Sequence, residues 1–296
     1  MHFSHSVNFT YSVLLFGLLF CCGCGAGGDP AGASDSENAD PPVPVAPADT
    51  TERELTVSDL HDKLKAKNPK YSRRGKFRKA GGQIRYAQLV QSGIVDVRPL
   101  KGLPLKYLDL TGNDLSDISA LKGMPLDELY LENTKVDDLS PLKDMPLTIL
   151  RLESTPVADI SPLAGLKLKQ LNLFKTKVND ISAVSNMSLN TLWLTDTQVE
   201  DLSPLKGKFL ESLDVQNTPV SDLSVLAGMT TLKRLNIAGS AVSDLTALKG
   251  LQLDRLIFTV DRIKQGIDDV RNMSSLKQIG GSFETVKPAA QFWAEN

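Results

Sequence analysis

Cysteine and histidine are almost absent from this chain of 296 residues. Its three cysteines all lie between positions 21 and 24, so the rest of the chain cannot form an internal disulfide. This excludes the disulfide scaffold of small secreted domains. Beyond the first five residues the only histidine is His61. The chain therefore has too few Cys and His residues for a zinc site of that type, and too few His residues for a catalytic triad that uses His.

Aromatic residues and a dominant charge are also scarce. Aromatics make up 6% of the chain, which is low for an enzyme with a ligand pocket but ordinary for an aliphatic repeat core. With 33 Lys and Arg against 35 Asp and Glu, the net charge is −2, which argues against a strongly basic nucleic-acid binder. Hydrophobic residues reach 41%, enough for a sizeable core in one large domain or two ordinary ones.

No apolar run is long enough to span a bilayer, which takes about 18 residues. The run at residues 11–22 instead has the length of a signal-peptide core, and Gly23 and Cys24 follow it. This arrangement resembles a bacterial lipoprotein signal, in which a small residue precedes the cysteine that receives the lipid. It differs from that pattern in having Cys21 where Leu is usual and no Lys or Arg before the apolar run.

The resemblance implies a signal peptide at residues 1–23 and a lipid on Cys24, which would anchor an exported protein to a membrane of the cell envelope. The alternatives are a cleaved secretory signal without lipid, and an uncleaved anchor. Residues 24–53 are rich in Ala, Pro, Gly and Asp and hold few large apolar side chains. We therefore expect a disordered linker that holds the following domain away from the membrane.

A repeat of 21 residues governs the rest of the chain. The spacing is 21 residues six times and 22 once, after a degenerate first unit at Ile84. The regular units start at Leu105, Leu126, Leu147, Leu168, Leu189, Leu210, Leu232 and Leu253. Leucines that alternate with polar residues, such as Leu108 and Leu110, predict one short strand per unit with one buried face.

The second half of each unit predicts a tight turn. A fixed aspartate is expected to bond backbone N–H groups, and the Ser-Pro pairs resemble a cap followed by proline at the first helical position. The aspartates are Asp96, Asp117, Asp138, Asp159, Asp180, Asp201, Asp222 and Asp244, and the pairs begin at Ser140, Ser161 and Ser203. We expect each turn to end at a residue in the left-handed backbone conformation, namely Gly102, Gly123, Asp144, Gly165, Asn186, Gly207, Gly228 and Gly250.

So few residues remain before the next strand that the turns must be 3₁₀ rather than full helices. One unit alone cannot offset the entropy of fixing its backbone, so the units must stack. We expect nine strands in one parallel sheet on the order of 40 Å long. The fold class is an α/β repeat: a solenoid with one curved parallel sheet, 3₁₀ turns on the convex side and small helical caps.

The pattern resembles the leucine-rich-repeat family, in particular its short internalin-like class, over residues 84–260. Where that class usually has Asn, this chain keeps only Asn113 and otherwise has Thr134, Thr155, Thr176, Thr197, Thr218 and Ser240. The hydrogen bonds inside the turns must therefore differ. We expect a basic N-terminal cap at 54–83 and a C-terminal cap at 261–296, with a helix over 261–273 that carries Ile263, Ile267, Val270 and Met273 on one face.

The tail Lys287–Trp293 is similar to the closing segment of bacterial arrays of this type, some of which are fused to Ser/Thr kinases. No kinase motif is present in the sequence, and the short Gly-rich stretches are badly placed to cradle phosphate. Kinase activity therefore does not carry over. We expect no cofactor and no metal.

Strand positions between the buried leucines should face the concave side, and they vary while the scaffold repeats. Large aromatics and Arg on such a surface favour partner binding, because these residues dominate binding hot spots. The alternative is that they merely cover the sheet. The predicted partner-binding set, called here the concave patch, is Tyr130, Glu132, Arg151, Glu153, Phe174 and Trp193. Its two glutamates would favour a partner with some positive charge.

Residues 63–85 hold ten Lys or Arg and no acid. Such a segment could touch anionic lipid, cell-wall polymer or nucleic acid, although a signal peptide disfavours the last. A solvated cap is the alternative interpretation. The candidate anion-binding residues are Arg73, Arg74, Lys76, Arg78 and Lys79.

Three functional hypotheses follow. The first is a non-enzymatic interaction module, a monomer that binds a protein or peptide on its concave face and no nucleic acid, with the membrane reached through the N-terminal lipid. The second is an envelope structural protein that binds anionic polymer or membrane through residues 63–85. The third is an enzyme, which the scarcity of His and the lack of a cofactor motif disfavour.

Overall fold

Each regular repeat begins with a strand whose central leucine is buried. The computed structural model describes residues 55–295. In this part of the chain the central leucines of the strands, from Leu108 to Leu256, are at most 1% exposed. The signal peptide predicted at 1–23, the lipidation site Cys24 and the whole linker at 24–53 lie outside the described residues, as does the start of the predicted cap.

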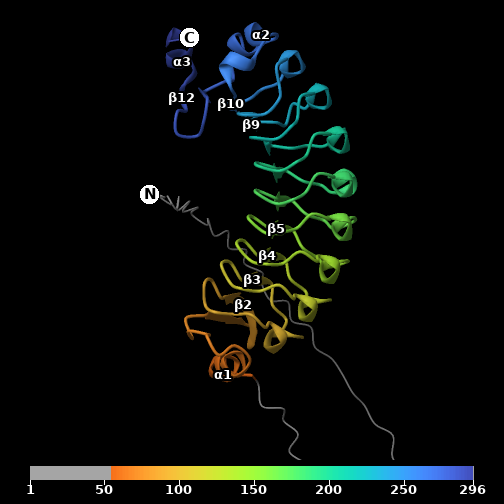
Figure 1. Ribbon diagram of the computed structural model, residues 1–296, viewed down its shortest axis with the longest axis vertical. Coiled ribbons are helices and arrows are strands. Elements are labelled where there is room, and N and C mark those ends of the chain that lie inside the picture. The colour runs from red at the N-terminus through yellow and green to blue at the C-terminus, as the bar shows by residue number, and fades with distance from the viewer. Residues whose placement is uncertain (1–54, 296) are drawn as a thin grey trace, which may run out of the picture. The chain divides into compact units, whose positions relative to one another are not determined.

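The strands form one sheet in which the order in space follows the order in sequence. β2 to β11 run parallel, while β1 and β12 pair antiparallel at the two ends. The strands are β1 (Lys76–Ala80), β2 (Gln83–Gln88), β3 (Tyr107–Asp109), β4 (Glu128–Tyr130), β5 (Ile149–Arg151), β6 (Gln170–Asn172), β7 (Thr191–Trp193), β8 (Ser212–Asp214), β9 (Arg234–Asn236), β10 (Arg255–Ile257), β11 (Gln278–Gly280) and β12 (Lys287–Pro288). Figure 1 shows them lining the concave side of the solenoid.

This arrangement confirms the predicted parallel sheet and extends it. The nine strands expected from the repeats correspond to β2 through β10. The structure adds β1, β11 and β12, which lie in the two caps where the repeat pattern has faded. The sheet is therefore longer than the repeat count alone indicates.

Short 3₁₀ turns line the opposite side, as expected (Figure 1). They are η1 (Arg98–Leu100), η2 (Ser119–Leu121), η3 (Ser140–Leu142), η4 (Ser161–Leu163), η5 (Ser182–Asn186), η6 (Ser203–Leu205), η7 (Ser224–Leu226), η8 (Thr246–Leu248) and η9 (Val260–Arg262). Before each of η1 to η8, the fixed aspartate accepts the N–H two residues later at 2.7–2.8 Å. The predicted role of these aspartates is confirmed.

The interpretation of Ser140, Ser161 and Ser203 as N-caps is wrong. Each is the first residue of its 3₁₀ turn, and the preceding cap position is an Ile or Leu without a side-chain cap bond. The aspartate two residues upstream takes over the capping. Asp138, for example, accepts both the N–H and the hydroxyl of Ser140, at 2.8 and 2.9 Å.

The left-handed turn ends are confirmed at seven of the eight predicted positions, with φ between 62° and 90°. Asn186 is the exception, because it lies inside η5, which is five residues long rather than three. The hydroxyl of Ser185 donates to Ser182 O at 2.7 Å within this longer turn. The turn then passes directly into extended backbone at Met187, so no left-handed residue is needed.

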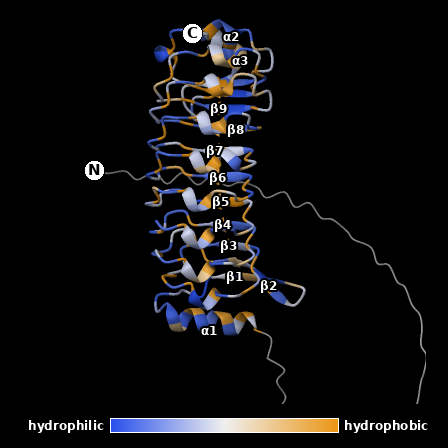
Figure 2. Cartoon of the chain, turned by 90° about the vertical axis from the view of Figure 1, so that its right-hand side faces the viewer, coloured by the Kyte–Doolittle hydropathy of each residue, from blue (hydrophilic) through white to orange (hydrophobic). Residues whose placement is uncertain are grey.

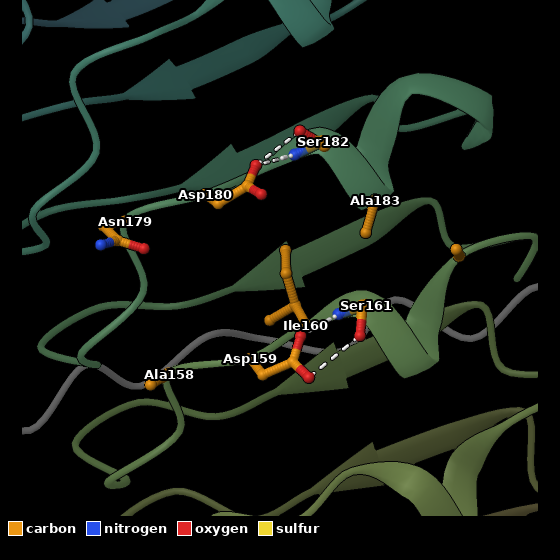
Figure 3. A pocket seen from close by; sticks show the side chains of 9 residues that line it. Ala158, Asp159, Ile160, Ser161, Asn179, Asp180, Ser182 and Ala183 are labelled. Atoms are coloured by element: carbon orange, nitrogen blue, oxygen red, sulfur yellow. Dashed lines mark hydrogen bonds between the residues drawn. The ribbon is translucent and has the colours of Figure 1, made fainter.

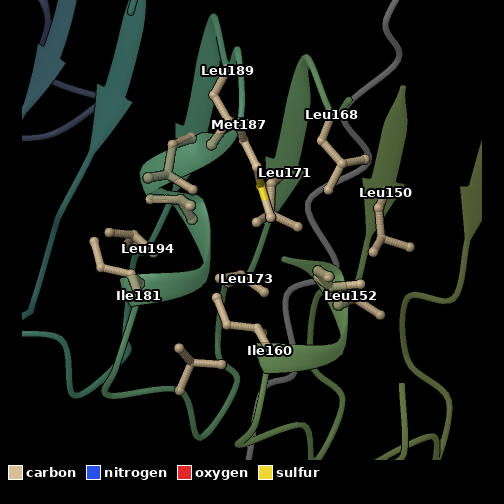
Figure 4. Packing of buried hydrophobic residues seen from close by; sticks show 14 of the residues in the cluster. Leu150, Leu152, Ile160, Leu168, Leu171, Leu173, Ile181, Met187, Leu189 and Leu194 are labelled. Atoms are coloured by element: carbon tan, nitrogen blue, oxygen red, sulfur yellow. The ribbon is translucent and has the colours of Figure 1, made fainter. Parts of the chain in front are cut away.

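The core is a set of aliphatic columns that run through the whole stack. In Figure 4, Leu150, Leu171 and their neighbours from adjacent repeats fill the space between the strands and the 3₁₀ turns. The valine column, from Val136 to Val242, is at most 2% exposed. Figure 2 looks onto the side of the turns and shows hydrophobic and hydrophilic residues alternating in every repeat. Because each layer is covered only by its neighbours, the repeats are stable only as a stack.

The N-terminal cap combines a helix and a β-hairpin. Helix α1 (Val57–Lys67) begins with a capping box between Thr56 and Asp59 and buries Leu60 and Leu64. Buried Asn68 then joins the cap to the first repeat, because its Oδ1 accepts the N–H groups of Val95 and Asp96 at 2.7 and 2.8 Å. The β1–β2 hairpin continues the sheet.

The C-terminal cap contains less helix than predicted over 261–273. Only α2 (Ile267–Arg271) is α-helical there, after the separate turn η9. Gly266 separates the two, with a φ of 78° and the backbone of Leu245 so close that a side chain would clash. α3 (Ala289–Glu295) then follows β12. Among the described residues, no helix has the length and apolar character to cross a membrane.

Candidate functional site

The structure brings the concave patch together on four adjacent strands and the loops that leave them. Tyr130 is the register partner of Arg151, Arg151 of Asn172, and Asn172 of Trp193. Partners in register point to the same face of a parallel sheet, so these side chains lie in one row across β4 to β7. The concave patch is therefore one surface, and its residues are half-buried by one another.

Arg151 is the centre of this surface. Its guanidinium carbon lies 5.6 Å from the ring centroid of Tyr130 and 5.5 Å from that of Trp193, so two cation–π contacts hold it from both sides. Asn172, which lies between Arg151 and Trp193 in the row, is short and buried. Arg151 Nε is also buried and has no hydrogen-bond partner among the described residues. Rings on both sides thus position the side chain, and none of its N–H groups donates a hydrogen bond to a described residue.

The two glutamates of the concave patch interact with the charge of this arginine. Partial burial raises the pKa of both Glu132 and Glu153, and the positive charge of Arg151 opposes that rise. Glu132 also accepts a hydrogen bond from the hydroxyl of Thr111 at 2.7 Å. Neither forms an ion pair of 4 Å or less with any described residue. The patch therefore presents carboxylates that a cationic partner could neutralise.

Phe174 occupies the neighbouring column, on the loop that leaves β6. The ammonium of Lys175 lies over its ring, 4.8 Å from the centroid, in a cation–π contact. The backbone N–H of Phe174 donates to Asn172 Oδ1 at 2.9 Å, which fixes the start of the loop. Phe174 thus lies beside the row that contains Arg151 and widens the patch.

The predicted binding set omits two aromatic residues that extend this surface toward the N-terminus. Tyr86 and Tyr107 stack with 4.3 Å between ring centroids and 12° between planes, and Tyr107 lies 5.2 Å from Tyr130. Arg78 on β1 places its guanidinium 4.8 Å from the ring of Tyr86. Tyr86 belongs to the degenerate first unit, where the only available signal was its alignment with Tyr107.

The tyrosine hydroxyls are hydrogen-bond donors at physiological pH. Burial, more than any nearby charge, raises the pKa of both Tyr107 and Tyr130 above the usual value of 10. Tyr130 donates to Glu128 at 2.8 Å, and Tyr107 donates to Asp109 at 3.4 Å. These bonds orient the rings and exclude a role for either tyrosine as an anionic group.

The predicted anion-binding residues differ in their contacts. Arg73 pairs with Asp62 at 2.7 Å, and Arg78 lies on the ring of Tyr86. Arg74, Lys76 and Lys79 are exposed. The only described histidine, His61, is held between aromatic rings, with its Nδ1 2.8 Å from the hydroxyl of Tyr71. Its ring contacts make His61 part of the packing of the cap, and burial lowers its pKa.

A second polar group lies further along the same face. Asp214 is 6% exposed and accepts hydrogen bonds from Thr195, Gln216 and Asn236 at 2.5, 3.0 and 2.9 Å. Burial raises its pKa, and these three bonds oppose the rise. The three groups bonded to Asp214 are neutral donors, and the positive charge of Arg255 also opposes the rise of its pKa. This cluster stabilises the C-terminal half of the sheet face and offers a ligand little.

A shallow hollow of about 470 Å³ lies on the other side of the solenoid, between two neighbouring repeats (Figure 3). Asp159 and Asp180 line it, but their carboxylates are already bonded to Ser161 and Ser182. The hollow contains no residue of the concave patch. Among residues 55–295, no group of three or more His, Cys, Asp and Glu residues is arranged to hold a metal.

Comparison with known proteins supports the repeat assignment. A leucine-rich-repeat family model matches residues 104–122. The crystal structure of internalin C2 from Listeria monocytogenes matches with a TM-score of 0.56 and 26% identity over 68% of this chain and 92% of that chain. No curated protein sequence matches the chain significantly.

A plant protein shares the fold at lower identity. The receptor kinase HAESA ectodomain of Arabidopsis, crystallised with a peptide hormone ligand, matches with a TM-score of 0.50 and 17% identity. The match covers 64% of this chain and 40% of that chain. The protein is thus a leucine-rich-repeat solenoid that resembles Listeria internalins.

Proposed function

We propose that this protein is a non-enzymatic interaction module that binds a protein or peptide on its concave sheet face. The observation that carries the proposal is Arg151, held between Tyr130 and Trp193 with its Nε buried and unpartnered. A half-buried arginine without hydrogen bonds is costly, and a ligand that accepts from its terminal N–H groups would reduce that cost. Trp, Tyr and Arg together are also the commonest binding hot spots.

The geometry favours a protein or peptide over a sugar polymer. Sugars bind aromatic residues through exposed ring faces. Here the faces of Tyr86 and Tyr107 are turned toward each other, and a guanidinium lies over those of Tyr130 and Trp193. The surface therefore offers ring edges, hydroxyls, N–H groups and carboxylates. Backbone amides and mixed side chains complement such a surface.

The leucine-rich-repeat fold is compatible with this function and does not specify the partner. The plant ectodomain described above holds a peptide hormone with the same architecture. One frame can carry very different binding surfaces, so the partner must follow from the side chains of this chain.

The test is capture of a partner from envelope extract with the full-length chain in detergent. One bait carries the native sequence, and the other has Ala at Tyr130, Arg151, Phe174 and Trp193. The control bait has Ala at four exposed lysines beside the 3₁₀ turns, Lys122, Lys143, Lys206 and Lys249. A partner held by the native and control baits, and lost by the concave variant, supports the proposal. Equal capture by all three contradicts it.

We also propose that the module is exported and tethered to the cell envelope by a lipid on Cys24, and acts as a monomer. The sequence pattern around Gly23 and Cys24 supports this proposal. A Cys24→Ser chain should move from the membrane fraction to the soluble fraction of the envelope compartment. Membrane association that persists without Cys24 would indicate an uncleaved anchor instead.

Binding of anionic membrane or polymer by residues 63–85 is the second candidate. Arg74 and Lys76 favour it, because they are exposed and form no ion pair or hydrogen bond with any described residue. This function predicts binding that falls steeply with salt. Retention on anionic vesicles that does not depend on salt, measured with the Cys24→Ser chain, would contradict it.

A further inference from the structure

The basic N-terminal hairpin and the concave patch belong to one continuous surface. In β1, Lys76 pairs with Gln88 and Arg78 with Tyr86. Directly paired residues of antiparallel strands share a face, so Lys76 and Arg78 point to the same side as Tyr86. Tyr86 is in turn the register partner of Tyr107 on β3. The concave face therefore begins with two cations.

The same face becomes acidic three strands further along. Glu128 on β4 and the two glutamates of the concave patch lie there, and the positive charges of Arg151 and Lys175 oppose only part of their charge. None of the three glutamates forms an ion pair of 4 Å or less with a described residue, and neither do Lys76, Arg78 or Arg151. The surface thus carries unneutralised positive charge at one end and excess negative charge at the other.

The distance between the two ends suits a short extended segment. From β1 to β4 and β5 there are three to four strand intervals of about 4.8 Å, or about 14–19 Å. An extended chain advances about 3.3 Å per residue, so about five residues separate the two charged ends. The tyrosine edges and the terminal N–H groups of Arg151, which donate to no described residue, lie between and beside them, where they can contact the backbone of the segment.

We propose that the concave face selects an extended peptide segment that has acidic residues at one end and Lys or Arg about five residues away. The acidic end contacts Lys76 and Arg78, and the basic end contacts Glu132 and Glu153. This inference rests on the proposed function and specifies its ligand. A uniform polyanion meets repulsion at the glutamates, and a uniform polycation meets it at β1, so neither matches the whole surface.

The experiment is a selection of random twelve-residue peptides on the full-length chain in detergent, followed by sequencing of the bound pool. Peptides with acids and bases segregated about five residues apart should be enriched over peptides of the same composition with mixed order. The pair Lys76→Glu with Arg78→Glu should remove the preference for the acidic end and leave that for the basic end. The pair Glu132→Gln with Glu153→Gln should do the reverse.

Affinity measurements on one selected peptide make the test quantitative. Each of these double variants should weaken binding by about fivefold at low salt, as expected for a few exposed charge contacts. The control Lys122→Glu with Lys143→Glu makes the same change in net charge as Lys76→Glu with Arg78→Glu, but away from the strands, and should leave affinity unchanged. Thermal unfolding of each variant verifies that it is folded.

The outcomes separate this inference from the proposed function. If the selected peptides lose binding with Trp193→Ala but show no charge segregation, the inference is wrong and the concave-face module stands. If no selected peptide depends on Trp193, both fail. If charge segregation is lost equally in the control variant, long-range charge rather than this surface explains it, and the inference is again wrong.

Discussion

Arg151 on β5 reaches past Asn172 on the next strand to place its guanidinium 5.5 Å from the ring of Trp193 on β7. Such a contact depends on the flat guanidinium, which can lie over rings on both sides while its N–H groups remain free at the edge. An ammonium has the same charge but neither the shape nor the five donors.

Arg151→Lys should therefore weaken binding of a captured partner by about tenfold, with little loss of stability. The measurement is the affinity of the purified variant, together with its thermal unfolding. Arg234→Lys on β9 is the matched control, because Arg234 is exposed on the same face and outside the concave patch. Unchanged affinity in Arg151→Lys would show that only the charge matters.

Glu132→Gln should stabilise the protein at neutral pH. Burial raises the pKa of Glu132 above its ordinary value of 4.5, so the folded state disfavours the carboxylate relative to the unfolded chain. This penalty is fully present above the raised pKa, shrinks as the pH falls through it, and vanishes below 4.5. Gln keeps an acceptor for the hydroxyl of Thr111 and carries no charge.

Urea unfolding of both chains at pH 7 and pH 4 tests this prediction. The variant should have the higher midpoint at pH 7, and the two midpoints should converge at pH 4. A variant that is less stable at pH 7 would mean that attraction to Arg151 outweighs the burial of the carboxylate. Glu200→Gln, at an exposed position, should change neither midpoint.

The period of the leucines was sufficient to predict the solenoid, its parallel sheet and its 3₁₀ turns, because each column has one physical role in every repeat. The same logic placed Tyr130, Arg151 and Trp193 on one face. It failed where the pattern ends. β11 and the β1–β2 hairpin contain no full repeat. Without knowledge of that hairpin, the contact between Arg78 and the ring of Tyr86 cannot be predicted.

The detailed contacts of the concave face were also beyond sequence reasoning. Register places Tyr130 beside Arg151, but only side-chain packing shows that Arg151 also reaches Trp193 and leaves Nε unpartnered. Likewise, the Ser-Pro pairs have the composition of a helix start, and only the bonds to Asp138 and its equivalents show that the cap lies two residues earlier.

Asn113 and the threonines at the equivalent positions should differ in how much each contributes to the free energy of unfolding. Asn113 Oδ1 accepts the N–H groups of Ser92 and Ile94 at 3.1 and 2.9 Å, and its Nδ2 donates to Leu89 O and Leu110 O at 2.7 Å each. Thr176 donates only to Leu173 O, which also accepts the N–H of Thr176. Removing the asparagine therefore leaves several buried backbone groups unpaired.

We expect Asn113→Ala to cost about 3 kcal/mol and Thr176→Val about 1 kcal/mol in free energy of unfolding. Chemical denaturation measures both. Equal losses would mean that water replaces the amide of Asn113 inside the turn. The comparison also tests the expectation that the turns of this chain are held together differently after the first regular unit.

Lys208 and Phe209 occupy each other's usual places in the repeat. In the neighbouring units the first position is Met187 or Met229, at 1% and 7% exposed, and a polar residue follows. Here Lys208 is half-buried and Phe209 is 77% exposed. The Lys208 ammonium donates to the carbonyls of Ser185 and Met187, so hydrogen bonds replace the hydrophobic contact of the other repeats.

Exchanging the pair, as Lys208→Met with Phe209→Lys, should raise stability by about 1 kcal/mol. Burying a methionine contributes about 1.5–3 kcal/mol, whereas water can replace the bonds to two carbonyls near the surface, each worth about 0.5–1.5 kcal/mol. The midpoint of thermal unfolding should rise by about 2–4 °C. Phe209→Lys alone is the control and should change little, because Phe209 contributes almost nothing to the core. A lower midpoint in the exchanged chain would show that the ammonium of Lys208 holds η5 in place more strongly than burial of a methionine could.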